Sequence, residues 1–309
     1  MKDNQYMLDN YIIIGNKFKE ENQLQKALHF YNKAYKCRGG SEDIDLLLEM
    51  GLIYDELEDY DAAKEKYKEV LSIDPKEARG YYSLAIAYDN EKNYIKAIKF
   101  YKLAIELDPY YDRAYFFLAN AYDEIGQKEK AIQYYKKVIE MDDEDFWAHV
   151  NLGSIYEEVN EDNLALEMME KALELDGENY KALFNMGVIL KKLGNIQEAA
   201  DYYILSIQQN LEFPYSYFNL AIIYKEQKKY NEGIEVLSKA IYYNKEVAVL
   251  YYNRACLYVL TKQLEKAMRD LIQATKLDTD LIQYMKEDKE LEGLRDLEAY
   301  KIMFSEDRS

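Results

Sequence analysis

Asparagine recurs at one fixed spacing in the second half of the sequence. The four residues of this asparagine ladder lie 34 residues apart, at Asn151, Asn185, Asn219 and Asn253. A side-chain amide both donates and accepts hydrogen bonds, so it can pair with a peptide bond. Amides presented at a constant interval could therefore hold the backbone of an extended peptide without reading its side chains.

The elements that must position these asparagines follow the same period. The stretch Ala78–Tyr111 contains two apolar runs whose members recur every three or four residues, as they do on one face of a helix. Residues 91–93 separate the runs. Asp108 and Pro109 end the second run, because proline lacks an amide donor and disfavours helix at the residue before it. The stretch therefore predicts a helical hairpin.

Copies of this hairpin fill most of the chain. A small residue recurs at the eighth position of each copy and another at the twentieth, where the two helices would cross closely. One hairpin buries too little apolar surface to offset its chain entropy, so the copies must stack on one another. The eight copies are expected to begin near Leu8, Ile44, Ala78, Asp112, Phe146, Tyr180, Pro214 and Ala248.

These in-phase copies resemble the tetratricopeptide repeat (TPR) family over roughly residues 8–281. The resemblance implies an all-α fold, a right-handed superhelical solenoid of helix-turn-helix hairpins whose first helices line a concave groove. We expect residues 1–309 to form a single TPR solenoid of this kind.

Aromatic side chains at the fifth position of most copies would face the implied groove. These residues are Tyr82, Phe116, Phe184, Phe218 and Tyr252. They could anchor apolar side chains of an extended peptide, and Trp147, Arg113 and Lys181 at the second position complete the predicted peptide-binding set. The alternatives are that the aromatic residues serve packing alone and that the asparagines reflect family consensus alone.

Charge differs along the implied groove. Positions 12 and 13 are mostly acidic in the second to fifth copies, whereas Lys191 and Lys192 occupy them in the sixth and Lys225 occupies position 12 in the seventh. The acidic stretch would suit a basic segment of a partner, and the lysines would suit an acidic one. The alternative is that both stretches are ordinary solvated surface.

The last copy carries an arginine, Arg254, at a core position. A buried arginine needs a partner, and Asp270 on the paired helix is the predicted one. The motif around these residues is similar to a repeat subtype found in TPR co-chaperones, in which an arginine and an aspartate occupy the same places.

Residues 282–309 leave the period but still read as two short amphipathic helices. A solenoid end needs a cap that covers its last apolar face, and the expected cap residues are Leu291, Leu294, Leu297 and Met303. A free recognition helix is the alternative for this segment.

Composition and motifs exclude several classes of function. The formal net charge of −18 opposes nonspecific binding to nucleic acid. No apolar run is long enough to span a bilayer, and the first residues lack the plan of a signal peptide, so we expect a soluble cytoplasmic protein with free thiols at Cys37 and Cys256. The sequence contains no HExxH, CxxC or glycine-rich phosphate loop. We therefore expect no enzyme activity, catalytic residues, cofactor or metal.

The sequence thus predicts a noncatalytic scaffold that holds an extended segment of a protein or peptide partner in the concave groove. The lysine and arginine pattern of the chaperone-binding TPR clamp is missing, which argues against chaperone tails as ligands. Two alternatives remain open. The chain could be a structural subunit that self-associates through its solenoid ends or convex face, or an accessory subunit of a separately encoded enzyme.

Overall fold

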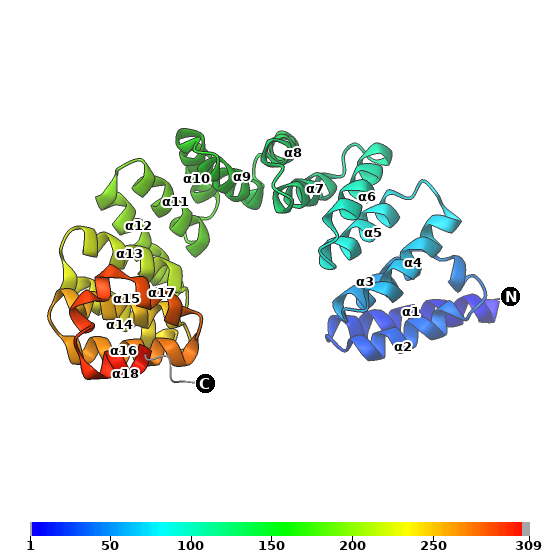
Figure 1. The fold of residues 1–309 in the computed structure, drawn as a ribbon. Helices are drawn as coiled ribbons and strands as arrows, with labels where there is room; N and C mark the ends of the chain where they lie inside the picture. The colour runs from blue at the N-terminus through cyan, green and yellow to red at the C-terminus, as the bar shows by residue number, and fades with distance from the viewer. Residues whose placement is uncertain (1, 305–309) are drawn as a thin grey trace. The chain divides into compact units, whose positions relative to one another are not determined.

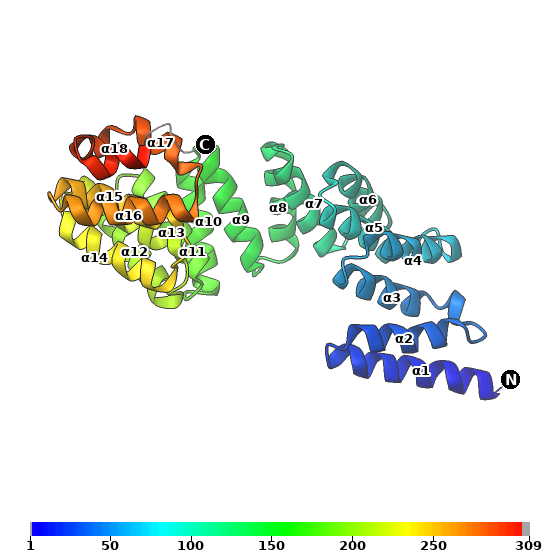
Figure 2. The ribbon, with the colours of Figure 1, turned by 60° about the horizontal axis from the view of Figure 1, so that its bottom comes forward.

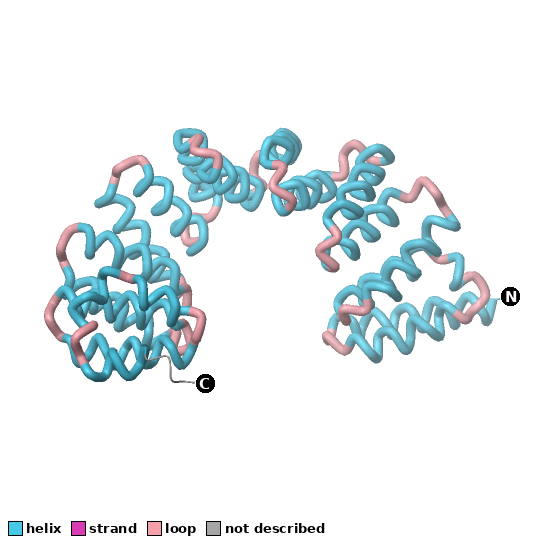
Figure 3. The backbone as a smooth tube through the Cα atoms, viewed as in Figure 1, coloured by secondary structure: helices cyan, strands magenta, loops and turns pink. Residues whose placement is uncertain are grey.

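The computed structural model describes the backbone of residues 2–304 and the side chains of residues 6–304, with the exception of Met303. All regular secondary structure in this part of the chain is helical (Figures 1 and 3). The predicted all-α fold of helix-turn-helix hairpins is therefore confirmed.

Each hairpin pairs a first helix with a second helix. The first helices are α1 (Lys2–Glu20), α3 (Ile44–Glu56), α5 (Ala78–Asn90), α7 (Asp112–Glu124), α9 (Phe146–Glu158), α11 (Tyr180–Lys192), α13 (Pro214–Glu226) and α15 (Ala248–Leu260). The second helices are α2 (Leu24–Tyr35), α4 (Tyr60–Ile73), α6 (Tyr94–Leu107), α8 (Lys128–Met141), α10 (Asp162–Leu175), α12 (Ile196–Gln209), α14 (Tyr230–Tyr243) and α16 (Leu264–Leu277). A short 3₁₀ helix, η1 (Gly40–Glu42), lies in the longer connection between α2 and α3.

From α3 onward, every first helix begins at the residue where the period places it. The exception is α1, which begins at Lys2 and not near Leu8, because neither glycine nor proline interrupts the sequence before Leu8. Side-chain caps help to set the starts. Asp43, for example, accepts a hydrogen bond from the backbone nitrogen of Leu46 at 3.0 Å.

The turn inside each hairpin contains a residue in the left-handed conformation. Gly126 and Gly194 have φ angles of 72° and 86°, as expected for residues without a Cβ. The same place in other hairpins holds residues such as Lys92, with φ of 59°. Lysine and glutamate at these turns give no local sequence signal, so only the period locates them.

A buried tyrosine packs under a small residue in several hairpins. The ring of Tyr67 is fully buried, and a Cβ added to Gly51 would lie 2.2 Å from its Cε1 atom. Tyr203 packs against Gly187 in the same way, with a corresponding distance of 2.6 Å. The small residues therefore allow the close approach that their spacing predicts.

The chain divides into two compact units. The first is Met1–Ile155 and the second is Tyr156–Ser309, with the boundary inside α9. The second helix of one hairpin packs on the first helix of the next from α2 to α7 in the first unit and from α10 to α15 in the second (Figure 2). The single solenoid over residues 1–309 stays a prediction. In the described residues no helix has the length and hydrophobicity needed to cross a membrane.

The predicted ion pair in the last hairpin is confirmed. Arg254 donates from Nε to Asp270 Oδ2 at 2.7 Å and from Nη2 to Asp270 Oδ1 at 2.8 Å. A third bond runs from Nη1 to the hydroxyl of Ser238 at 3.0 Å. The guanidinium is thus held by two successive hairpins.

The C-terminal segment packs on this last hairpin. It comprises α17 (Leu281–Glu287), η2 (Lys289–Leu294) and α18 (Glu298–Phe304). Leu291 and Leu294 are fully buried against residues that include Cys256 and Leu271, and Leu297 is partly buried there. This is the packing expected of a cap. The side chain of Met303 lies outside the described residues.

Candidate functional site

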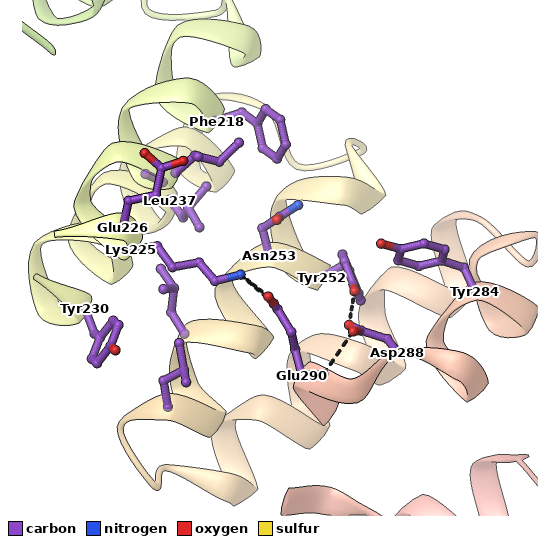
Figure 4. Close-up of a pocket in the computed structure, with 14 residues that line it drawn as sticks. Phe218, Lys225, Glu226, Tyr230, Leu237, Tyr252, Asn253, Tyr284, Asp288 and Glu290 are labelled. Atoms are coloured by element: carbon purple, nitrogen blue, oxygen red, sulfur yellow. Dashed lines mark hydrogen bonds and ion pairs between the residues drawn. The ribbon is translucent and has the colours of Figure 1, made fainter. Parts of the chain in front are cut away.

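A pocket of about 560 Å³ lies in the second unit, between α13, α15 and the C-terminal segment (Figure 4). We call it the terminal pocket. Three predicted peptide-binding residues, Phe218, Asn253 and Tyr252, line it. Its other lining residues include Ile222, Tyr230, Leu257, Leu260 and Tyr284. Apolar and aromatic walls with a few polar groups are the usual lining of a ligand site.

The C-terminal segment supplies acidic groups to the terminal pocket. Figure 4 shows Lys225 and Glu290 reaching toward each other, with Nζ 2.5 Å from the carboxylate. The hydroxyl of Tyr252 donates to Asp288 Oδ2, and Asp288 Oδ1 accepts from the backbone nitrogen of Glu290 at 2.9 Å. Tyr252 is only 7% exposed, so its ring forms part of the pocket floor.

Cys256 lies beside the same two carboxylates. Its sulfur and an oxygen from each of Asp288 and Glu290 lie within 4.8 Å of one another. Both carboxylates already accept hydrogen bonds. Burial, reinforced by the charge of Glu290, raises the pKa of the Cys256 thiol to about 12. Because both carboxylates are engaged within the protein, we assign no metal to this cluster.

The amides of the asparagine ladder are half-buried and partly engaged. Asn219 and Asn253 each donate to a backbone carbonyl of their own helix, Tyr215 O at 3.0 Å and Val249 O at 2.8 Å. Asn151 instead donates to the hydroxyl of Tyr135 at 3.1 Å and to the side chain of Asn120 at 3.2 Å. An amide has two N–H donors and a carbonyl acceptor, so these bonds leave capacity for a ligand. Asn185 is half-buried on α11.

Residues of the predicted peptide-binding set line two smaller hollows of the first unit. The aromatic hollow, of about 290 Å³, brings together four predicted residues. Its lining consists of Tyr82, Arg113, Phe116, Trp147, Phe117, Asp112 and Asp145. Trp147 is 44% exposed and packs edge-on against Phe146, with ring centroids 5.0 Å apart. Exposed aromatic surface of this kind is common at binding hot spots.

The acidic pocket of the first unit measures about 450 Å³ and shares Phe117 with the aromatic hollow. Three carboxylates line it, those of Asp89, Asp123 and Glu124. Its remaining lining residues are Asn90, Tyr94, Phe117, Asn120, Tyr135, Asn151 and Ser154. The first member of the asparagine ladder therefore lies at an acidic site.

The groove lysines of the second unit all have acidic partners. Lys191 Nζ lies 3.2 Å from Glu226, Lys192 Nζ lies 2.9 Å from Glu157, and Lys225 pairs with Glu290. These pairs were not predicted from the sequence. The first two could have been, because opposite charges stand at positions 12 and 13 of neighbouring repeats. The lysines therefore do not form an uncompensated positive surface.

Within the part of the chain that the structure describes, two carboxylates of the first unit accept a side-chain hydrogen bond from a neutral tyrosine alone. Asp55 accepts from the Tyr67 hydroxyl at 2.6 Å, and Asp89 accepts from that of Tyr101 at 2.9 Å. Burial raises the pKa of Asp55 to about 6 and also raises the pKa of Asp89, although each tyrosine bond opposes the shift. Oδ1 of Asp55 is buried and accepts no hydrogen bond from any described residue.

The other predicted residues lie outside these three hollows. Phe184 is half-buried, with its ring centroid 5.3 Å from that of Phe213 and 5.8 Å from that of Tyr203, an arrangement that serves packing. Lys181 is exposed, with Nζ 6.0 Å from the ring centroid of Tyr180. Asn185 and Asn219 line none of the three hollows.

Comparisons with known proteins identify the repeats. Family models described as Tetratricopeptide repeat match residues 44–77, 78–111, 112–145, 148–179, 168–200, 214–247 and 248–281. A search of curated protein sequences found no match.

Solved structures show the same fold. A tetratricopeptide repeat protein from Parabacteroides merdae superposes with a TM-score of 0.62 and 18% identity, covering 85% of this chain and 99% of that one. YrrB, described as a TPR protein with an unusual peptide-binding site, gives 0.51 and 18%, covering 60% and 95%. MamA from Desulfovibrio magneticus gives 0.50 and 25%, covering 55% and 95%.

Proposed function

The chain belongs to the tetratricopeptide repeat family, and we propose that it is a noncatalytic scaffold that binds an extended segment of a protein or peptide partner. The observation that carries the proposal is the shared lining of the hollows. In each unit, residues at the fifth position of successive repeats line one hollow. Tyr82 and Phe116 do so in the first unit, and Phe218 and Tyr252 do so in the second.

The chemistry of these surfaces suits a peptide. Aromatic and aliphatic walls accept apolar side chains, and amides such as Asn253 can pair with backbone N–H and C=O groups. The same groups recur with the repeat, so a polymer with a regular backbone can make the same contact more than once. The peptide-binding site that the YrrB structure describes agrees with this proposal and assigns no residue here.

We expect loss of two ladder amides to weaken peptide binding. The test uses 12-residue peptides selected from a random display library against the full chain, with Kd measured by fluorescence anisotropy. Asn219→Ala combined with Asn253→Ala should raise Kd about tenfold or more, because each lost hydrogen bond is worth about 0.5–1.5 kcal/mol. The described partners of both amides are backbone carbonyls of their own helices, so folding should change little.

The matched control removes two amides from exposed positions of second helices, as Gln208→Ala combined with Asn231→Ala. It should leave Kd unchanged. Circular dichroism verifies the helix content of both double variants. Equal Kd values for the two double variants would contradict use of the ladder.

A further inference from the structure

The acidic pocket and the aromatic hollow of the first unit adjoin through the ring of Phe117. We propose that this pair of sites binds a basic segment of the partner, one that presents a lysine or arginine beside a bulky apolar side chain. The inference rests on the proposed function and specifies the partner for the first unit. Asp89, Asp123 and Glu124 would face the cation, and Phe116 and Trp147 would contact the apolar group.

The groove lysines of the second unit are paired more completely than the carboxylates of the acidic pocket. Lys191, Lys192 and Lys225 each pair with a carboxylate. In the acidic pocket, Asp123 has a cationic partner, Lys128 at 2.6 Å. Among the described residues, Asp89 accepts from a neutral hydroxyl and pairs with no cation, and Glu124, which is exposed, adds a like charge to its surroundings. A cationic side chain of the partner would supply the missing positive charge.

The aromatic hollow provides the apolar half of the site. Tyr82, Phe116 and Phe117 line the hollow and are half-buried, and Trp147 is more exposed. The lining includes one cation, Arg113, against the two carboxylates of Asp112 and Asp145. The hollow therefore keeps a net negative charge. An acidic segment would be repelled at both sites, and so would the phosphates of a nucleic acid.

Two neighbouring sites of different character select for a segment that has both features. A cation alone would leave the aromatic surface exposed, and an apolar group alone would leave the carboxylates uncompensated. The close spacing of the two sites fits an extended chain, because residues two apart along such a chain project to the same side.

Trp147 is the only tryptophan of the chain and lies in the aromatic hollow, so its emission reports occupancy directly. The probes are three end-blocked octapeptides built from the repeats Lys-Ser-Leu-Ser (the Lys–Leu peptide), Glu-Ser-Leu-Ser (the Glu–Leu peptide) and Lys-Ser-Ser-Ser (the Lys–Ser peptide), so that the charged and apolar side chains stand two residues apart. The Lys–Leu peptide should change the Trp147 emission saturably, and its affinity should fall as the salt concentration rises. The Lys–Ser peptide should bind at least fivefold more weakly, and the Glu–Leu peptide should cause no saturable change. Equal affinity for the Lys–Leu and Glu–Leu peptides would overturn the inference.

Matched variants separate local contacts from net charge. Asp89→Asn combined with Glu124→Gln should raise the Kd of the Lys–Leu peptide at least fivefold, and the asparagine keeps an acceptor for Tyr101. Glu106→Gln combined with Glu140→Gln, at exposed positions of α6 and α8, removes the same charge and should have no more than a twofold effect. Equal effects of the two pairs would overturn the inference. That result would leave the proposed function standing, because the proposed function is tested in the second unit with selected peptides and the ladder variants.

Discussion

Replacing Asp270 by alanine is expected to lower the free energy of unfolding by about 3–5 kcal/mol. The side chains of Arg254 and Asp270 are only 16% and 9% exposed, and two hydrogen bonds join them. Removal of the carboxylate leaves a guanidinium that cannot lose its charge and has little contact with water. The hydroxyl of Ser238 would be its main remaining partner. Urea unfolding, followed by circular dichroism, measures the loss.

A double variant distinguishes the cost of an orphaned charge from the value of the ion pair. Arg254→Met combined with Asp270→Leu replaces the pair by apolar groups and should recover most of the stability that Asp270→Ala loses. An Asp270→Ala protein that unfolds at the same urea concentration as the unaltered chain would show that Arg254 finds another partner or water.

Truncation of Leu294 should destabilise the second unit by about 2–5 kcal/mol. The side chain is fully buried, beside Leu291 and Met285, on the apolar surface formed by α15 and α16. Leu294→Ala would leave a cavity there and loosen the cover over the last hairpin. Thermal and urea unfolding of the full chain measure the change.

A leucine of the same unit with a different environment serves as the control. Leu205 on α12 is 42% exposed, and Leu205→Ala should cost less than about 1 kcal/mol. If Leu294→Ala left unfolding unchanged but weakened peptide binding, the segment would act as a recognition helix and not as a cap.

The fold was largely predictable because the repeat amplifies weak local signals. The start of α5 at Ala78 or of α13 at Pro214 follows from a pattern that recurs in every copy. The start of α1 at Lys2 lacked such support, because it precedes the first periodic residue. The left-handed turn at Lys92 uses a residue with no local preference for that conformation, so only the period locates it.

Repeat position indicated which residues of the first helices line a common pocket, but not which groups pair with them; that these residues bind a peptide stays a prediction. Phe218 and Asn253 line a common pocket, as their repeat position suggested. Asp288 and Glu290 reach the same pocket from a segment outside the period, so no register linked them to Tyr252 or Lys225.

Some partnerships did carry a signal in the sequence. The bonds of Tyr67 to Asp55 and of Tyr101 to Asp89 repeat at one spacing. Tyr203 occupies the same repeat position as Tyr67, but its repeat has Lys191 at the position that Asp55 occupies. The buried hydroxyl of Tyr203 has no partner among the described residues. In these repeats, the residue at the twelfth position therefore decides whether the buried tyrosine donates this hydrogen bond.

Site-specific photocrosslinking shows directly whether the first helices carry the peptide-binding surface, as we propose. A benzophenone amino acid replaces either Phe218 on α13 or Tyr242, which is 70% exposed on α14 of the same hairpin. With display-selected peptides, we expect a crosslinked product from the Phe218 site, suppressed by excess unlabelled peptide, and none from the Tyr242 site. Crosslinking at Tyr242 in the absence of any at Phe218 would contradict the claim.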